Sequence, residues 1–66
     1  MQIVLNGKRH ELADKTTVSG LLTALNMVGR RVAVEINGEI IPRSSHSTHY
    51  LQANDKVEII HAVGGG

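Results

Sequence analysis

Hydrophobic and polar residues alternate at the start of the chain, over residues 1–5. Alternation with a period of two is typical of a half-buried strand, here with Met1, Ile3 and Leu5 on the inward face. Asn6-Gly7 follows at once, and both residue types tolerate the positive φ angles of a two-residue hairpin turn. The pattern therefore predicts a hairpin whose second strand runs over residues 8–12.

The apolar spacing then changes to that of a helix. One stripe recurs at i, i+3, i+4 and i+7: Val18, Leu21, Leu22 and Leu25. Thr17 stands where its hydroxyl can cap the first free backbone N–H groups. We predict a short amphipathic helix that ends near Asn26 or Met27, with Gly29 as the residue at its exit.

A second hairpin is predicted beyond the helix. Residues 32–36 alternate again, and a second Asn-Gly pair, Asn37-Gly38, turns the chain into residues 39–41 before Pro42 ends the pairing. The Ser-, Thr- and His-rich residues 43–49 show no period and are interpreted as a loop or a single helical turn, followed by a brief strand at Tyr50-Leu51.

Residues 57–63 form the last predicted strand, which has apolar residues on both faces and therefore suits the centre of a sheet. The order is strand, strand, helix, strand, strand, strand. If the first and last strands lie side by side, one helix covers one face of a mixed sheet of four to five strands. This α+β arrangement is the β-grasp fold. We expect residues 1–63 to form this single domain.

Composition narrows the function. The chain of 66 residues has one Tyr and neither Phe nor Trp, so its core must be aliphatic and leaves little room for a ligand pocket. We therefore expect a protein that is not itself an enzyme. A net charge of +1, without aromatic residues beside the basic pairs, argues against nucleic acid as a partner. No long apolar run suggests a membrane, and the expected location is the cytoplasm.

The residue types needed for several kinds of site are missing or poorly spaced. The chain has no cysteine, which excludes disulfides, thiolate metal sites and a cysteine nucleophile. Of the four histidines, only His46 and His49 are close, and their spacing does not predict a metal site. A triad drawn from a nearby serine, His46 and Asp55 lacks a strained nucleophile turn. His61 is interpreted as a partly buried polar residue.

Three glycines close the sequence, Gly64, Gly65 and Gly66. Residues without Cβ are hard to fix by packing and make a chain thin enough to enter a narrow cleft. Extended, they would carry the terminal carboxylate about 10 Å beyond Val63. We expect residues 64–66 to be a flexible tail whose reactive group is the Gly66 carboxylate. A frayed terminus or a leftover linker remains the alternative.

Two segments, residues 34–44 and residues 55–66, are similar to a known family. The first contains Asn-Gly-Glu-Ile-Ile-Pro-Arg and the second ends in the glycine tail. Together with the β-grasp pattern, they resemble the sulfur carrier protein of thiamine (thiazole) biosynthesis, a ubiquitin-like family. The resemblance covers essentially the whole chain. Members usually end in two glycines, and Gly64 adds a third here.

The resemblance implies a function in sulfur transfer. An E1-like adenylating enzyme would use ATP and Mg²⁺ to join AMP to the Gly66 carboxylate, and a cysteine desulfurase persulfide would supply sulfur to form a thiocarboxylate. Thiazole synthase would then take the sulfur. The carrier would need no permanently bound cofactor and no catalytic residue. The alternatives are the small subunit of molybdopterin synthase, which shares the tail, and a ubiquitin-like protein modifier.

Docking to these partners is predicted on the face of the sheet that the helix leaves open. The outward positions of the strands there give a mild apolar patch: Val4, Ala33, Ile60 and Ala62. Scattered exposed aliphatic residues are ordinary on protein surfaces, which is the competing interpretation. Arg30, Arg31 and Arg43 would add charge steering, or are simply solvated surface charges.

Overall fold

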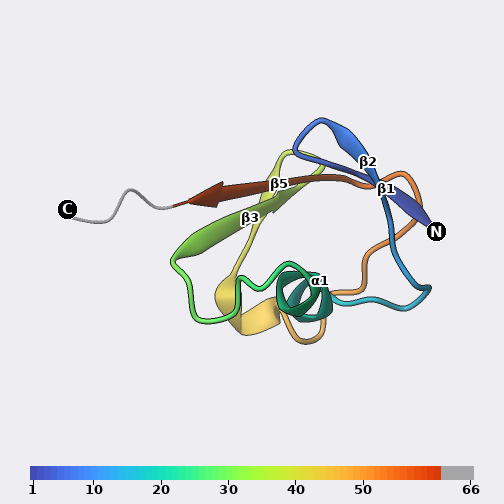
Figure 1. Cartoon of the computed structure of the whole chain (residues 1–66). Coiled ribbons are helices and arrows are strands. Elements are labelled where there is room, and N and C mark those ends of the chain that lie inside the picture. Colours follow the sequence, from blue (N-terminus) through green and yellow to red (C-terminus); the bar gives the residue numbers. More distant parts are fainter. Residues whose placement is uncertain (62–66) are drawn as a thin grey trace.

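The computed structural model describes residues 1–61 of the chain (Figure 1). In this part, the elements follow in the order β1 (Gln2–Leu5), β2 (Lys8–Glu11), α1 (Val18–Ala24), β3 (Val32–Ile36), β4 (Glu39–Ile41), the 3-10 turn η1 (Arg43–Ser45) and β5 (Lys56–His61). The strands form one sheet in the order β2-β1-β5-β3-β4. β1 and β5 are parallel and the other neighbours are antiparallel. The predicted α+β fold, with the first and last strands at the centre of a mixed sheet, is confirmed.

Both hairpins turn at the predicted Asn-Gly pairs. Asn6 and Gly7 have φ angles of 49° and 83°, and Asn37 and Gly38 have φ angles of 53° and 88°. Two successive positive φ angles define the turn whose twist matches that of the flanking strands. Asparagine and glycine reach this conformation at lower cost than other residues, which explains why these short local sequences fix two hairpins.

The helix begins as predicted and ends earlier. The Thr17 hydroxyl oxygen accepts a hydrogen bond from the Gly20 backbone N–H at 3.0 Å. At the other end, α1 stops at Ala24, and Asn26 takes the left-handed conformation with a φ of 59°. The Met27 N–H donates to the Leu22 carbonyl at 2.8 Å, the six-residue closure of a Schellman motif. The expected end near residue 26 or 27, with Gly29 at the exit, is wrong because Asn26 supplies the positive φ.

A loop after η1 completes the start of the helix. The Val18 and Ser19 N–H groups donate to the His49 and His46 carbonyls at 3.0 and 2.9 Å. These bonds satisfy two donors that the helix itself leaves free. The predicted helical turn within residues 43–49 is present as η1. The predicted strand at Tyr50-Leu51 is reduced to a single bridge between Thr17 and Tyr50.

The core lies between the sheet and α1 and is aliphatic, as the composition predicts. The least exposed side chains come from the strands β1, β3 and β5 and from the helix: Ile3, Val18, Leu21, Val34 and Val57. Figure 1 shows α1 and η1 on the same side of the sheet, so the other face is left uncovered in the described part of the chain. The described members of the predicted docking patch, Val4, Ala33 and Ile60, lie on this open face.

Candidate functional site

β5 is the strand that leads toward the glycine residues, and both hairpin turns hold it in place. The Asn6 side-chain Oδ1 accepts a hydrogen bond from the Ile59 N–H at 2.9 Å. The Asn37 Oδ1 accepts one from the Lys56 N–H at 2.9 Å, and the Asn37 Nδ2 donates to Asp55 Oδ1 at 3.0 Å. The two turn asparagines therefore fix β5 from both sides, a role that local turn chemistry alone does not reveal.

The two halves of β5 differ in their neighbours. β1 pairs with Lys56 and Val57, and Asn6 extends this contact to Ile59. Beyond that point, the pairing given by the described residues comes from β3, with Ile60 opposite Ala33 and His61 opposite Val32. β5 is thus held on two sides at its base and on one side at its outer end.

The structure brings together only part of the predicted docking patch. Ile60, which is 44% exposed, lies directly opposite Ala33 on the open face. Val4 lies opposite Lys56, four residues back along β5, or about 13 Å away. The fourth member, Ala62, lies outside the described residues, as do Val63 and the predicted tail Gly64–Gly66.

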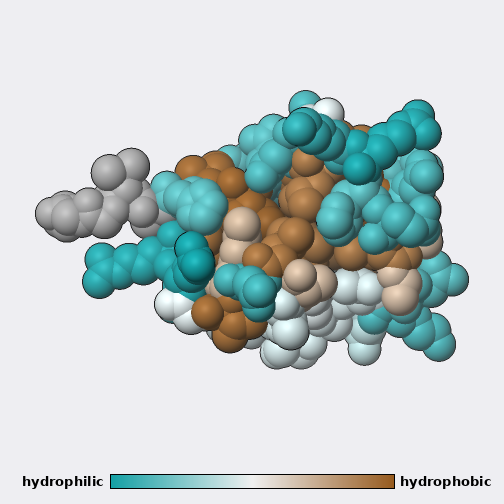
Figure 2. Space-filling model, in the orientation of Figure 1, coloured by the Kyte–Doolittle hydropathy of each residue, from teal (hydrophilic) through white to brown (hydrophobic). Residues whose placement is uncertain are grey.

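The open face also carries a pair of acidic residues that the sequence pattern did not single out. Glu35 and Glu58 are directly opposite each other on β3 and β5, and Ile40, 59% exposed, is opposite Glu35 on β4. Two carboxylates in this position repel each other. The alternation of side chains along β3 and β5 predicts that Glu35 and Glu58 both point outward. Only the strand register shows that they lie opposite each other. Figure 2 shows apolar surface on the described body, bordered by hydrophilic side chains.

The histidines and the suggested triad do not form a catalytic site. His61 is exposed, so its expected partial burial is wrong; it follows Ile60 near the one-sided end of the strand. His46 is buried, and its Nε2 lies 3.0 Å from the Ile41 carbonyl, which fixes Nε2 as the donor. The Asp55 carboxylate accepts bonds from Asn37 and Gln52. Within residues 1–61, no three potential metal ligands cluster.

The N-terminal ammonium is held far from this site, at the opposite end of the body in Figure 1. It donates to Glu11 Oε2 at 2.8 Å and to the Leu12 carbonyl at 2.7 Å. The hydrogen bond and the charge of the partner raise the pKa of the ammonium and lower the pKa of Glu11.

Among the described residues, no helix is both long and apolar enough to span a membrane.

Comparisons with known proteins agree with the fold and with the sequence resemblance. A model of the ThiS family matches residues 3–66. The sulfur carrier protein ThiS of Escherichia coli is 32% identical over the full length of both chains. The crystal structure of the thiamine biosynthesis protein ThiS from Geobacter metallireducens superposes with a TM-score of 0.87 at 33% identity, covering 100% of each chain.

A different kind of relative is much longer. A thiazole synthase of Magnetococcus marinus is 39% identical to this chain over 66 residues, which are 100% of this chain and 20% of the relative. The chain thus spans about a fifth of the length of the thiazole synthases that it matches. In these relatives, a segment similar to this chain belongs to the same polypeptide as the rest of the synthase.

Proposed function

The chain belongs to the ThiS family of sulfur carriers in thiamine biosynthesis, and we propose that its Gly66 carboxylate is the group that carries the sulfur. The observation that supports this most directly is the extent of the family match, which runs to residue 66 and includes all three terminal glycines. A structural linker added to an unrelated domain would have no reason to be part of that match. The body, residues 1–61, then serves to position and present the end of the chain.

The proposed chemistry begins with activation of the carboxylate. A free carboxylate is a poor electrophile, and an E1-like enzyme with ATP and Mg²⁺ converts it to an acyl adenylate with release of pyrophosphate. The terminal sulfur of a persulfide, formed by a cysteine desulfurase, attacks the acyl carbon and AMP leaves. A second thiol cleaves the resulting acyl disulfide, which releases the thiocarboxylate and forms a new disulfide. Because these steps consume ATP, we place them in the cytoplasm.

Thiazole synthase is the proposed acceptor of the sulfur. Its support is the presence of a similar segment inside the longer thiazole synthases, where carrier and enzyme share one chain. Gly64, Gly65 and Gly66 are proposed to enter the active sites of both partners, since residues without Cβ fit a narrow channel. No group of this chain needs to act as acid or base, because the partners supply the chemistry.

Docking is proposed on the open face close to the end of β5. Ala33 and Ile60 form the central contact, and Ala62 continues it toward the tail. Val4 is proposed as a separate outer contact, because Glu58 lies between it and Ile60 along the same face. An Ile60→Ala variant tests this idea, with Ile40→Ala as a control that removes an exposed aliphatic side chain from the edge strand of the same face. Ile60→Ala should weaken partner binding and Ile40→Ala should leave it unchanged.

The central experiment follows the C-terminus. The full chain is incubated with ATP, the adenylating enzyme and the persulfide donor of the same host, and the intact mass is measured. We expect pyrophosphate exchange that depends on this chain, followed by a mass increase equal to the difference between sulfur and oxygen. A chain whose Gly66 carboxylate is converted to an amide is the matched control and should show neither. Sulfur loading of the amide would overturn the proposal.

Two alternatives give different results in the same system. A ubiquitin-like modifier would become joined to lysines of other proteins, visible as conjugates of higher mass. A small subunit of molybdopterin synthase would deliver its sulfur to a molybdopterin precursor. It would not serve as the sulfur donor in an assay with thiazole synthase. Transfer to thiazole synthase with no conjugates would exclude both.

A further inference from the structure

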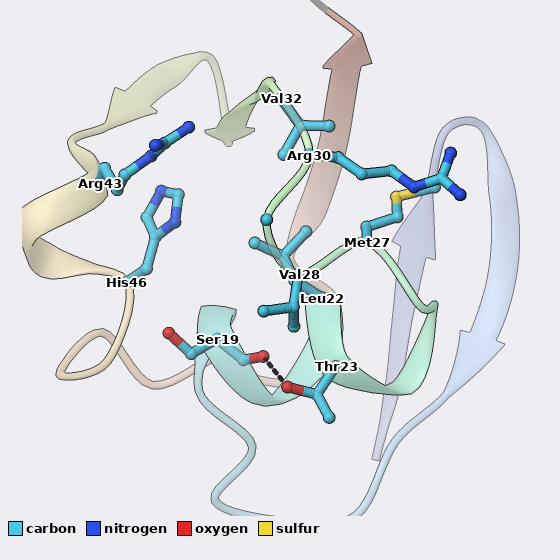
Figure 3. A pocket seen from close by; sticks show the side chains of 10 residues that line it. Ser19, Leu22, Thr23, Met27, Val28, Arg30, Val32, Arg43 and His46 are labelled. Carbon is cyan, nitrogen blue, oxygen red and sulfur yellow. Dashed lines mark hydrogen bonds between the residues drawn. The ribbon is translucent and has the colours of Figure 1, made fainter.

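A cavity of about 230 Å³ opens on the helix side of the body. Its apolar lining comes from α1, from the loop after α1 and from the start of β3, namely Leu22, Met27, Val28 and Val32. Val28 is 68% exposed. Figure 3 shows Leu22 and Val28 at the centre of the lining, with polar side chains around them.

Two arginines stand on opposite sides of this apolar centre. Figure 3 shows Arg43 on the same side of the cavity as His46, and Arg30 on the other side, with its guanidinium directed away from Arg43. Both arginines are exposed, and the ion pairs found among residues 1–61 involve neither of them. A guanidinium group binds carboxylates well because its planar donors match the two oxygens. The cavity thus offers two cationic groups that the described part of the body leaves without a carboxylate.

His46 contributes a further polar atom. Its Nε2 is committed to the Ile41 carbonyl, whereas no described residue bonds to Nδ1. Within residues 1–61, no fully buried side-chain nitrogen or oxygen lacks a partner, so Nδ1 keeps some contact with solvent although the residue is only 7% exposed. His46 is one of the residues that line the cavity.

The size of the cavity limits what can fill it. Sites for cofactors and drug-sized ligands measure about 300–1,000 Å³, which is larger than this cavity. The volume suits a single anchoring side chain of a partner protein, the usual content of a hot-spot pocket. An apolar centre between two arginines favours an apolar anchor with acidic neighbours.

We propose that this cavity is a docking site for a partner-protein segment in which a large apolar side chain is flanked by acidic residues. The apolar side chain fills the space around Val28, and the carboxylates pair with Arg30 and Arg43. The cavity adjoins the outer end of β5, because Val32 in its lining is paired with His61. The inference rests on the proposed function, in that this partner is one that receives the C-terminal tail.

A peptide titration tests the site without any partner enzyme. The ¹⁵N-labelled full chain is titrated with a peptide in which one leucine has two glutamates before it and two glutamates after it. We expect saturable shift changes in the amides that line the cavity. The Arg30→Gln/Arg43→Gln double variant should bind this peptide about fivefold or more weakly, the size expected for two exposed ion pairs. Arg31→Gln removes a neighbouring exposed arginine that does not line the cavity, and should change binding by less than about twofold.

Other probes decide between occupants. A peptide with alanine in place of leucine should bind more weakly, and one with lysines in place of glutamates should not bind. If AMP or inorganic phosphate shifted the same amides at lower concentration than the leucine peptide, the cavity would be an anion site and the proposal would be wrong. Equal losses in the double variant and in Arg31→Gln would indicate only general charge attraction, which also overturns it.

Partner binding separates this inference from the proposed function. The affinities of the double variant and of Arg31→Gln for the adenylating enzyme and for thiazole synthase are compared with that of the unmodified chain. A selective loss in the double variant, for either enzyme, supports the docking site. If the unmodified chain accepts and delivers sulfur while the double variant binds both enzymes normally, the docking site is refuted and the function stands. If the unmodified chain accepts no sulfur, the proposed function fails.

Discussion

The two ends of the body are built differently. At one end, the N-terminal ammonium is bound by Glu11 and by the Leu12 carbonyl, and the base of β5 lies between two strands and two turn asparagines. At the other end, Ile60 and His61 have β3 as their paired neighbour in the described structure. Among the described residues, the start of β5 therefore has strand neighbours on both sides, whereas Ile60 and His61 have one on the β3 side only.

This difference suggests that the two ends of β5 affect different properties, the free energy of unfolding at one end and partner binding at the other. A small domain has a free energy of unfolding of only about 3–10 kcal/mol at this chain length, so it cannot lose many contacts. The one-sided pairing of Ile60 and His61 lies where the proposed function places partner contacts. Substitutions at the base should therefore change the free energy of unfolding, and substitutions at the outer end should change binding.

The sharpest test compares two adjacent isoleucines of β5. Ile59→Ala removes a buried side chain, 6% exposed, and should cost about 2–5 kcal/mol of unfolding free energy. Ile60→Ala removes one that is 44% exposed and should cost less than about 1 kcal/mol. Urea unfolding of both variants measures the contrast. Equal losses would show that the open face of β5 contributes as much to stability as the buried face.

The turn asparagines give the next largest effect. Asn6→Gly keeps the positive φ but leaves the Ile59 N–H without its partly buried partner, at a cost of about 1–3 kcal/mol. Asn37→Gly removes two side-chain bonds that are exposed, and water replaces them, so about 1 kcal/mol or less is expected. Unfolding by urea and hydrogen exchange at Ile59 measure the difference. A larger loss of unfolding free energy in Asn37→Gly than in Asn6→Gly would contradict the idea that the Asn6 hydrogen bond stabilises β5 more.

The acidic pair on the open face should weaken the pairing of β3 with β5. Glu58→Gln removes the repulsion from Glu35 and should raise stability by about 0.2–1 kcal/mol, more at low salt. Glu39→Gln is the control, because Glu39 lies opposite Ile36. Thermal unfolding at low and high salt measures both variants. No gain at low salt would mean that the two carboxylates are already screened.

The smallest effect is expected at the anchored N-terminus, and it depends on pH. The pKa of Glu11 is lowered from 4.5, so its contribution exists above about that pH and is lost as the pH falls through the folded-state value. The pKa of the ammonium is raised from 8.0, so its contribution exists below about that pH and is lost as the pH rises through the folded-state value.

Glu11→Gln should therefore lower the melting temperature slightly between about pH 4.5 and 8 and have less effect outside this range. Because the pair is exposed, the change should be small and should shrink in high salt. Asp14→Asn, whose carboxylate is 3.5 Å from the ammonium, should have a still smaller effect. A change in melting temperature that is the same at every pH would argue against this ion pair.

Local sequence determined the elements of this fold. The two Asn-Gly pairs set both hairpins because few other residues accept two positive φ angles, and Thr17 with its apolar stripe set the start of the helix. The helix end was missed by a few residues, because asparagine at position 26 can close a helix as glycine does. The family resemblance, which rests on local segments and the glycine tail, was confirmed as well.

Only the tertiary structure decided which residues meet. The register between β3 and β5 places Ala33 against Ile60 and Glu35 against Glu58. The register between β1 and β5 places Val4 opposite Lys56, away from Ile60. The cavity between Arg30 and Arg43 joins residues of α1, β3 and the loop at η1, which no spacing along the chain relates. Side-chain periodicity gives the face on which a residue lies but not its neighbour across the sheet, because strand register is set by contacts between distant segments.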